Sequence, residues 1–171
     1  MIIQAQYLKD ISAERIRVEL TKLLVSDHPD KLLEAYVTGI TAYILPEFDR
    51  MMEQPQNNQY HRYNVGVHSI EAVKNIRADV TMRWAALLHD IGKPSTHTVD
   101  ENGTDHFYDH QIAGVPLVEA VLRRLKFDNN TIKDVCKLVR WHDFGMGCVP
   151  KKNTIRKLLG EVGKDFFPYI I

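Results

Sequence analysis

Histidines and one aspartate are the residues of this sequence whose types and spacing could do chemistry. The sequence holds eight histidines, and six of them fall between His61 and His110. Their sharpest unit is the pair His89-Asp90, which closes an apolar run. An imidazole nitrogen and a carboxylate oxygen at the end of a rigid helix can bind one divalent cation. The alternative is that His89 only caps the helix C-terminus while Asp90 is solvated.

Three further histidines fall at expected helix ends. His68 lies at the start of one helix, His110 opens another, and His142 closes a third. Antiparallel packing would bring these ends to His89-Asp90, and bundles assemble metal sites from facing helices in this way. Any one of these histidines alone is more often a satisfied polar residue. Together with the carboxylate they predict a divalent-metal site.

The predicted ligands favour particular metals and a particular reaction. Imidazoles with a carboxylate suit transition metals or Mg²⁺, whereas Ca²⁺ sites use oxygen only, so Mg²⁺, Mn²⁺, Ni²⁺, Co²⁺, Zn²⁺ and Fe²⁺ all stay open. Cys136 and Cys148 are not at zinc-finger spacing. A metal with open positions activates water for hydrolysis, and a pair about 3.5–4 Å apart acts most often on phosphate esters.

Helices are expected to position these residues. Apolar residues recur at helical spacing along most of the chain, and Ser12 with Glu14 predicts the first helix start. Pro46 should end the second helical run. A last short helix is expected to close at Gly160 or Gly163. The apolar stripes are Ile16/Leu20/Leu23/Leu24, Leu32/Leu33/Ala35/Tyr36/Ile40, Val65/Ile70/Val73/Ile76, Met82/Ala85/Ala86/Leu88, Val115/Val118/Val121/Leu122/Leu125, Ile132/Val135/Leu138/Val139 and Ile155/Leu158/Leu159.

Two segments break the helical pattern. Residues 54–59 are polar and carry no apolar periodicity, so we expect a loop. Residues 96–99 and 106–108, joined by the turn 100–103, are expected to pair as a small β-hairpin. The predicted fold class is therefore all-α, with one hairpin between ligand-bearing helices.

Composition bounds the class of protein. The chain has 171 residues, 44% of them hydrophobic, which fits one compact domain with or without a helical extension. Twenty-two basic and 22 acidic residues cancel, which argues against binding duplex nucleic acid by bulk charge but leaves a local basic patch open. Two cysteines, no leader-like start and no apolar run near ~20 residues predict a cytoplasmic protein without a membrane span.

These residues resemble the HD superfamily of metal-dependent phosphohydrolases. His68 and the run His89-Asp90-Ile91-Gly92-Lys93-Pro94 carry the resemblance. More narrowly, the chain is similar to the HD-containing region of bacterial tRNA nucleotidyltransferases, meaning CCA-adding enzymes and poly(A)-polymerase-like proteins. The narrower likeness extends from about Asp10 to Phe167 and rests on the stretches 10–17, 43–47, 60–65 and 94–110.

The resemblance implies an HD helical bundle, a divalent metal, and phosphatase or 2′,3′-cyclic phosphodiesterase activity on nucleotides or a tRNA 3′ end. It implies that Asp90 and Lys93 act in catalysis, with Lys93 facing a substrate phosphate. It also divides the chain into residues 1–52, which resemble the helices that follow the nucleotidyltransferase head, and an HD domain over 53–171. The implied ligands are His68, His89 and Asp90 for a first metal and His110 and His142 for a second.

The sequence also departs from the family pattern. Asn64, Asp109 and Gln111 stand where Asp, Gly and Glu are usual, and none of the three is an implied ligand. No Gly-Ser followed by an Asp-x-Asp pair occurs, so nucleotide addition is not expected of these residues.

The carboxylate that the family supplies from a later helix has no counterpart, so the HD domain is expected to be truncated at its C-terminus and its metal site incomplete. Glu161, between two glycines, is expected in a loop, and Asp165 as an N-cap. Asp143 follows His142 directly and would reach the same cation only if the helix ends there, because helical neighbours point ~100° apart.

Two other functions remain open at this stage. The first is a non-catalytic tRNA-binding or assembly module, in which metal only ties helices together. The second is a stringent-response-type nucleotide hydrolase, which shares the HD signature but not residues 10–17. An ordinary solvated face is the alternative for the basic residues that would meet RNA phosphates, which are Arg123, Arg124, Lys126, Lys151, Lys152, Arg156 and Lys157.

Overall fold

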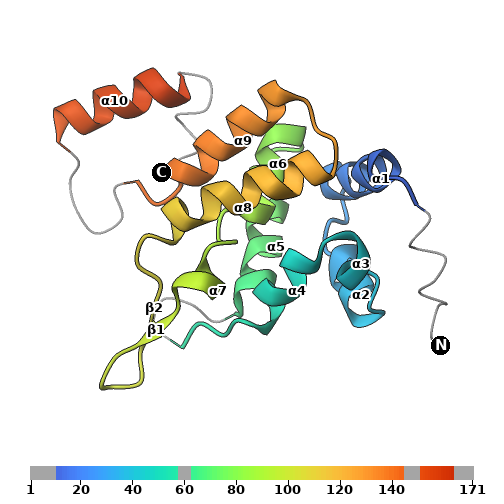
Figure 1. The fold of residues 1–171 in the computed structure, drawn as a ribbon, viewed down its shortest axis with the longest axis horizontal. Helices are drawn as coiled ribbons and strands as arrows, with labels where there is room; N and C mark the ends of the chain where they lie inside the picture. Colours follow the sequence, from blue (N-terminus) through green and yellow to red (C-terminus); the bar gives the residue numbers. More distant parts are fainter. Residues whose placement is uncertain (1–10, 58–62, 145–150, 164–171) are drawn as a thin grey trace.

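Helices account for nearly all regular structure in the computed structural model, which describes residues 11–57, 63–144 and 151–163 (Figure 1). One two-stranded antiparallel hairpin accompanies them in this part of the chain, so the predicted fold class is confirmed. None of the described helices is long and apolar enough to cross a membrane. The elements are α1 (Ala13–Val25), α2 (Lys31–Val37), α3 (Thr41–Ile44), α4 (Pro46–Glu53), α5 (Val65–Asn75), α6 (Val80–Leu88), α7 (Lys93–Thr96), β1 (Thr98–Val99), β2 (Asp105–His106), α8 (His110–Arg124), α9 (Asn129–Trp141) and α10 (Lys152–Val162).

Short polar side chains begin the helices that matter for the site. Ser12 caps α1 by accepting a hydrogen bond from the amide of Arg15, as predicted. The Oδ1 atom of Asn64 accepts from the amide of Val67 at 2.8 Å and begins α5. Each cap satisfies an amide that has no partner within its helix. Asn64, where the family resemblance leads us to expect Asp, therefore caps the helix that carries His68.

The core is continuous from the N-terminal helices to the later ones. Leu20 and Leu24 of α1 share one buried cluster with Phe48 of α4 and with Trp84 of α6. Trp84 also donates its Nε1 hydrogen to Thr21 Oγ1 at 3.0 Å. Helix α6 is buried from Met82 through Leu88 and packs against α1, α5 and α9. A helix fixed on several sides gives the pair that follows it, His89-Asp90, a rigid base.

Several elements differ from the sequence expectation. Pro46 ends the run before it but also begins α4, where its fixed φ suits the first helical position. The expected polar loop after α4 holds buried side chains at Gln54 and Gln56. The hairpin is shorter than expected, with two residues in each strand, and pairs Thr98 with His106. Thr96, which was expected in the first strand, is the last residue of helix α7.

The turn after Asp90 lies directly against the start of α8. A Cβ atom at Gly92 would clash with the carbonyl oxygen of His110 and would lie 2.8 Å from the amide nitrogen of Gly114. The amide nitrogen of Gly92 in turn lies 3.5 Å from a Cβ built on Gly114. Only glycine at position 92 permits this approach, which sets His110 beside Asp90.

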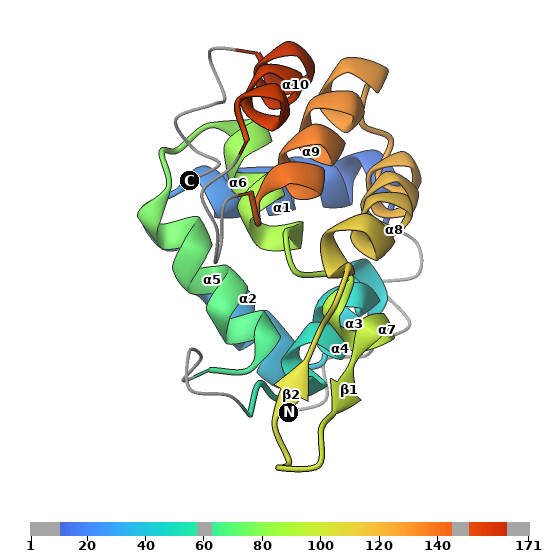
Figure 2. The ribbon, with the colours of Figure 1, turned by 90° about the vertical axis from the view of Figure 1, so that its left-hand side faces the viewer.

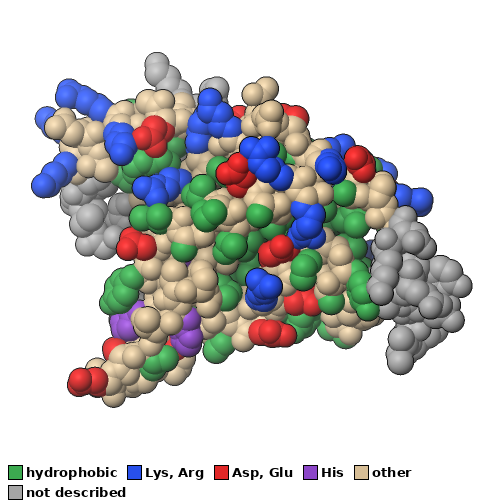
Figure 3. All heavy atoms as spheres, in the orientation of Figure 1, with side chains coloured by type: hydrophobic (Ala, Val, Ile, Leu, Met, Phe, Trp, Pro, Cys, Tyr) green, Lys and Arg blue, Asp and Glu red, His purple; other side chains and the backbone are tan. Residues whose placement is uncertain are grey.

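Charge is spread unevenly over the surface. Lys and Arg side chains are most frequent at the upper left of the face in Figure 3, where α10 lies. Lys151, Lys152 and Arg156 are exposed there. Others are ion-paired: Arg123 with Glu119, Arg124 with Glu47, and Lys157 with Glu161.

Candidate metal centre

Four helix ends bring the predicted ligands together. Figure 2 shows α5, α6, α8 and α9 around one region, with the hairpin at its lower side. His68 lies in the first turns of α5, and His110 is the first residue of α8. His89 and His142 are the residues that end α6 and α9. All four positions agree with the helix ends expected from the sequence.

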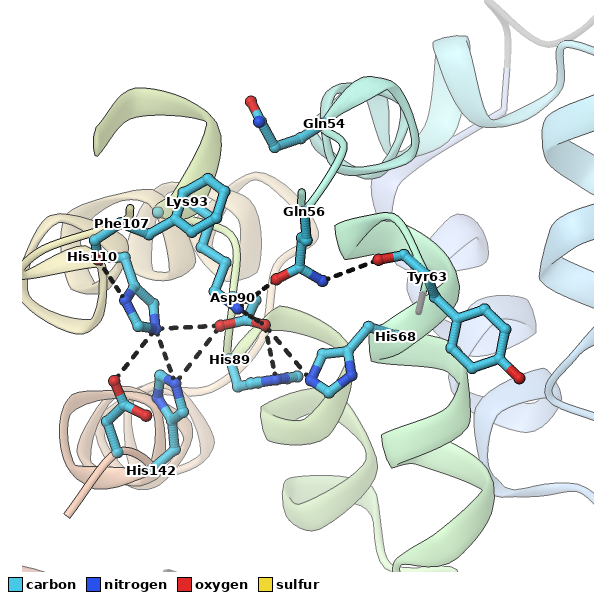
Figure 4. Close-up of polar contacts among 12 residues, drawn as sticks. Gln54, Gln56, Tyr63, His68, His89, Asp90, Lys93, Phe107, His110 and His142 are labelled. Carbon is cyan, nitrogen blue, oxygen red and sulfur yellow. Dashed lines mark hydrogen bonds and ion pairs between the residues drawn. The ribbon is translucent and has the colours of Figure 1, made fainter. Parts of the chain in front are cut away.

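Asp90 lies at the centre of these histidines (Figure 4). Its Oδ2 atom is 3.1 Å from His89 Nε2 and 3.6 Å from His68 Nε2. Its Oδ1 atom is 3.1 Å from His110 Nε2 and 3.6 Å from His142 Nε2. One carboxylate thus faces two imidazoles with each of its oxygens.

Backbone hydrogen bonds fix how three of the rings are turned. The Nδ1 atoms of His89, His110 and His142 lie 2.8, 2.8 and 2.7 Å from carbonyl oxygens three residues earlier. A carbonyl only accepts, so each Nδ1 carries the hydrogen. In the neutral ring the lone pair is then on Nε2, which faces Asp90. This second partner of the ring is what orients histidine ligands in metal sites.

The donor set fits a cation. The Nε2 atoms of His110 and His142 are 3.1 Å apart, and two lone pairs at that distance need a proton or a metal between them. Oδ2 of Asp90 is buried and accepts no well-aligned hydrogen bond within the described residues, although nitrogens surround it. Two groups here have ligand atoms within 4.8 Å of one another, namely His68–His89–Asp90 and Asp90–His110–His142. Both contain the same carboxylate.

The electrostatics keep Asp90 charged despite its burial. Burial by itself would raise its pKa, but the imidazoles of His89, His110 and His142 hold the pKa of Asp90 well below its usual range. For the pKa of His142 the same two effects act in the opposite directions. Burial disfavours the imidazolium, yet the hydrogen bond and charge of Asp90 outweigh it and raise the pKa of His142. The charged carboxylate therefore favours a bound positive charge at the cluster, which can be a proton on an imidazole or a metal ion.

A second acid, Asp143, lies beside His110 but belongs to neither of the two groups of ligand atoms. Helix α9 ends at Trp141, so His142 and Asp143 lie beyond it and can face one point. Asp143 Oδ2 is 3.6 Å from His110 Nε2. The condition set for Asp143 in the sequence is met. Periodicity could not reveal this, because it does not locate a helix end to one residue.

Glu161 lies elsewhere. It is inside α10, so the expectation of a loop at Gly160-Glu161 was wrong. Its Oε2 atom accepts a hydrogen bond from Trp141 Nε1 at 2.9 Å, which ties α10 to α9. Asp165 falls outside the described residues.

Lys93 is buried beside Asp90 rather than extended into solvent. Its Nζ atom is 2.8 Å from Asp90 Oδ2 and donates to Gln56 Oε1 at 2.7 Å. It also lies over the ring of Phe107, 5.5 Å from the centroid. Gln56 is held in turn by a hydrogen bond from its Nε2 to the carbonyl of Tyr63. Sequence reasoning missed Gln56 because no periodic signal marks a loop side chain that turns inward.

The cluster opens into a cavity of about 830 Å³. All five predicted ligands and Lys93 line it, together with Asp143. Apolar residues of α5, α6 and α9 form one wall, and the segment from Asp105 to Gln111 forms another. A volume of this order accommodates a small organic ligand.

The remaining histidines that the structure describes lie outside this cluster. His97 Nε2 is 2.8 Å from Asp105 Oδ1, and His106 Nε2 is 3.0 Å from Asp100 Oδ2. These bonds brace the hairpin. The bond from His106 lowers the pKa of Asp100 to about 2. His61 falls outside the described residues.

Two family models match the chain. The HD domain model matches residues 59–158. A model described as the probable RNA and SrmB-binding site of polymerase A matches residues 1–52. Residues 53–58 lie between the two matches.

Among curated proteins the chain is similar to tRNA nucleotidyltransferases. It is 33% identical to the multifunctional CCA protein of Actinobacillus pleuropneumoniae over 141 residues, which is 77% of this chain and 33% of that protein. It is 35% identical to the A-adding tRNA nucleotidyltransferase of Deinococcus radiodurans over 136 residues, which is 75% of this chain and 31% of the relative. The chain thus spans about a third of the length of these relatives.

Proposed function

The chain belongs to the HD domain family, and from this premise we propose that it is a divalent-metal-dependent phosphohydrolase. The proposed substrates are nucleotides or an RNA 3′ end, with phosphatase or 2′,3′-cyclic phosphodiesterase chemistry. The observation that carries the proposal is one buried carboxylate, Asp90, shared by two groups of histidines. Two adjacent cation sites of this kind suit phosphate esters.

The protein's own residues prepare the site for an anionic substrate. A divalent cation bound at the cluster would supply Lewis acidity and an activated water. His68, His89 and Asp90 would hold one cation, and Asp90, His110 and His142 a second. Since backbone carbonyls fix three of the rings, these ligands need little reorganisation on binding.

Lys93 has the role of a fixed positive charge at the cavity wall. Its ammonium is positioned by Asp90 and Gln56. A cation held in a buried, preorganised place stabilises charge that develops on a phosphoryl group more than a mobile surface lysine does. Lys93 is therefore the proposed electrostatic partner of the substrate phosphate.

The relatives point to RNA as the substrate class. The relative from Deinococcus radiodurans is named a tRNA nucleotidyltransferase, and residues 1–52 match a model described as a probable RNA-binding site. This supports a tRNA 3′ end as the physiological substrate, with free nucleotides as smaller analogues.

One experiment tests the proposal directly. Purified protein is analysed for bound metals and then assayed against nucleoside monophosphates, 2′,3′-cyclic nucleotides and a short RNA with Mg²⁺, Mn²⁺, Co²⁺ or Ni²⁺. We expect phosphoester hydrolysis that chelation abolishes. Metal bound at full occupancy with no hydrolysis under any condition would overturn the proposal.

A non-catalytic RNA-binding module is the second candidate, favoured by the exposed cations on and beside α10 together with the match of residues 1–52. It predicts RNA binding that weakens steeply with salt and that needs divalent metal only to hold the helices together. The assay above separates the two, since a binding module releases no phosphate.

A further inference from the structure

An exposed aromatic ring stands at the mouth of the metal-site cavity. Tyr108 lines this cavity, and 71% of its surface is exposed to solvent. Histidine and hydrophobic side chains lie next to each other at the surface where the hairpin joins the body of the molecule (Figure 3). An exposed aromatic ring at the edge of a ligand cavity offers a flat apolar surface to a bound molecule.

The orientation of this ring is fixed. It stacks on the ring of His106, with centroids 5.3 Å apart and planes inclined by 7°. Its hydroxyl lies 3.3 Å from His106 Nδ1, and His106 is held by Asp100 at 3.0 Å. The chain Asp100–His106–Tyr108 therefore presents a preorganised surface, so a ligand that stacks on it loses less conformational entropy on binding.

The neighbouring aromatic residue is used differently. Phe107 stacks on His97 and also lies beneath the ammonium of Lys93. Its ring is therefore occupied by contacts within the wall of the cavity. Of these two consecutive aromatic residues, Tyr108 is the one whose ring remains available to a ligand.

The ring is also within reach of the cluster. Tyr108 precedes His110 by two residues, and two residues of backbone span at most about 7 Å. His110 places its Nε2 atom 3.1 Å from Asp90 Oδ1. Tyr108, His110 and Asp90 line the same cavity, so one ligand that fills it can place a phosphate at the cluster and a flat ring against Tyr108.

We propose that Tyr108 is a stacking platform for the nucleobase next to the phosphate that is hydrolysed. This inference rests on the proposed function and adds the residue by which the site would distinguish a nucleotide or an RNA end, through its base, from other phosphoesters. Stacking accepts any base, because every base has a flat π face. The platform therefore selects nucleotides without selecting their sequence.

The test compares two ligands that differ only by the base, adenosine 5′-monophosphate and ribose 5-phosphate. Their binding to the Mn²⁺-loaded protein is measured by calorimetry, and phosphate release is followed in parallel. The variants are Tyr108→Ala, Tyr108→Phe and the control Tyr43→Ala. Tyr43 is also exposed, but it lies in α3 and does not line the cavity.

We expect the wild-type chain to bind the nucleotide at least about tenfold more tightly than the sugar phosphate. Tyr108→Ala should abolish this difference without weakening ribose phosphate, whereas Tyr108→Phe and Tyr43→Ala should keep it. Equal wild-type affinities, or a Tyr108→Ala variant with unchanged preference, would overturn the platform. Base-dependent binding without phosphate release would instead leave the platform standing and contradict hydrolysis.

Discussion

Asp90 carries the negative charge that both proposed cation sites would share. Its two oxygens face different pairs of imidazoles, and the residue is only 1% exposed. Asp143 contributes at one point, 3.6 Å from His110. Because neutral imidazoles alone bind hard cations poorly, we expect affinity for metal to depend on Asp90 far more than on any one histidine.

We predict that Asp90→Asn removes metal retention while leaving the helices folded. The substitution keeps the shape of the side chain but removes the charge, so affinity should fall by at least about 100-fold, beyond the effect of losing an outer partner. Elemental analysis after dialysis measures metal content, and far-UV circular dichroism measures helix content. Asp100→Asn is the matched control, since Asp100 also faces a histidine but on the hairpin. A variant at position 90 that retains wild-type metal would contradict the site.

Lys93→Met should show that the ammonium and a metal ion neutralise the same carboxylate. Removing one partner of a buried ion pair costs about 3–5 kcal/mol. We expect a loss of this order in the metal-free protein and a smaller loss once divalent metal is bound, with metal content unchanged.

Denaturant unfolding with and without metal measures the two losses. Lys74→Met, which removes an exposed ion pair with Glu71, should change neither value. If metal content falls together with stability in Lys93→Met, the lysine helps to hold the metal site in place and does not act on the substrate phosphate.

At the level of helices, the sequence was informative about ends and poor about loops. His89, His110 and His142 could be placed because apolar stripes stop or begin beside them. Helix α4 was missed because a proline that ends one helix can equally begin another. The inward turn of Gln56 and the reach of Asp143 depend on contacts with distant segments, which no local pattern encodes.

Gly92→Ala should move α8 away from the turn that carries Asp90. The added methyl group would meet the carbonyl of His110, a backbone atom that cannot turn aside. Forced overpacking of this kind costs about 1–3 kcal/mol, and here it also displaces a ligand. We therefore expect lower stability together with weaker metal binding, measured by unfolding and by metal titration. Gly160→Ala, in α10 with nothing within 4 Å, should leave metal binding unchanged. Normal metal affinity in Gly92→Ala would show that this contact does not position His110.

At the scale of the molecule, the two segments that match family models share one hydrophobic core. Leu24 precedes the HD match yet is fully buried in the same cluster as Trp84 and Val139. The division after residue 52, between a segment that resembles the helices following the nucleotidyltransferase head and an HD domain, therefore stays a prediction, and the two parts share one core.

We expect Leu24→Ala to destabilise the entire described fold by about 2–5 kcal/mol, the usual loss for a buried leucine. In a Trp141→Phe background, Trp84 fluorescence and far-UV circular dichroism should report one shared midpoint, shifted equally. Val37→Ala, at a residue 83% exposed, should shift neither signal. Separate midpoints for the two signals would show that the N-terminal helices unfold on their own.

The close approach of Gly92 to α8 also means that the position of His110 does not depend on the tip of the hairpin. Its two ends are pinned by packing between the α7 turn and the start of α8, while the tip, from Asp100 to Gly103, is exposed. Lengthening a flexible loop costs only about 0.6 kcal/mol for each doubling. We therefore expect that this exposed tip can be lengthened or exchanged while the ligands on either side keep their positions. Substrate preference would then evolve separately from the chemistry.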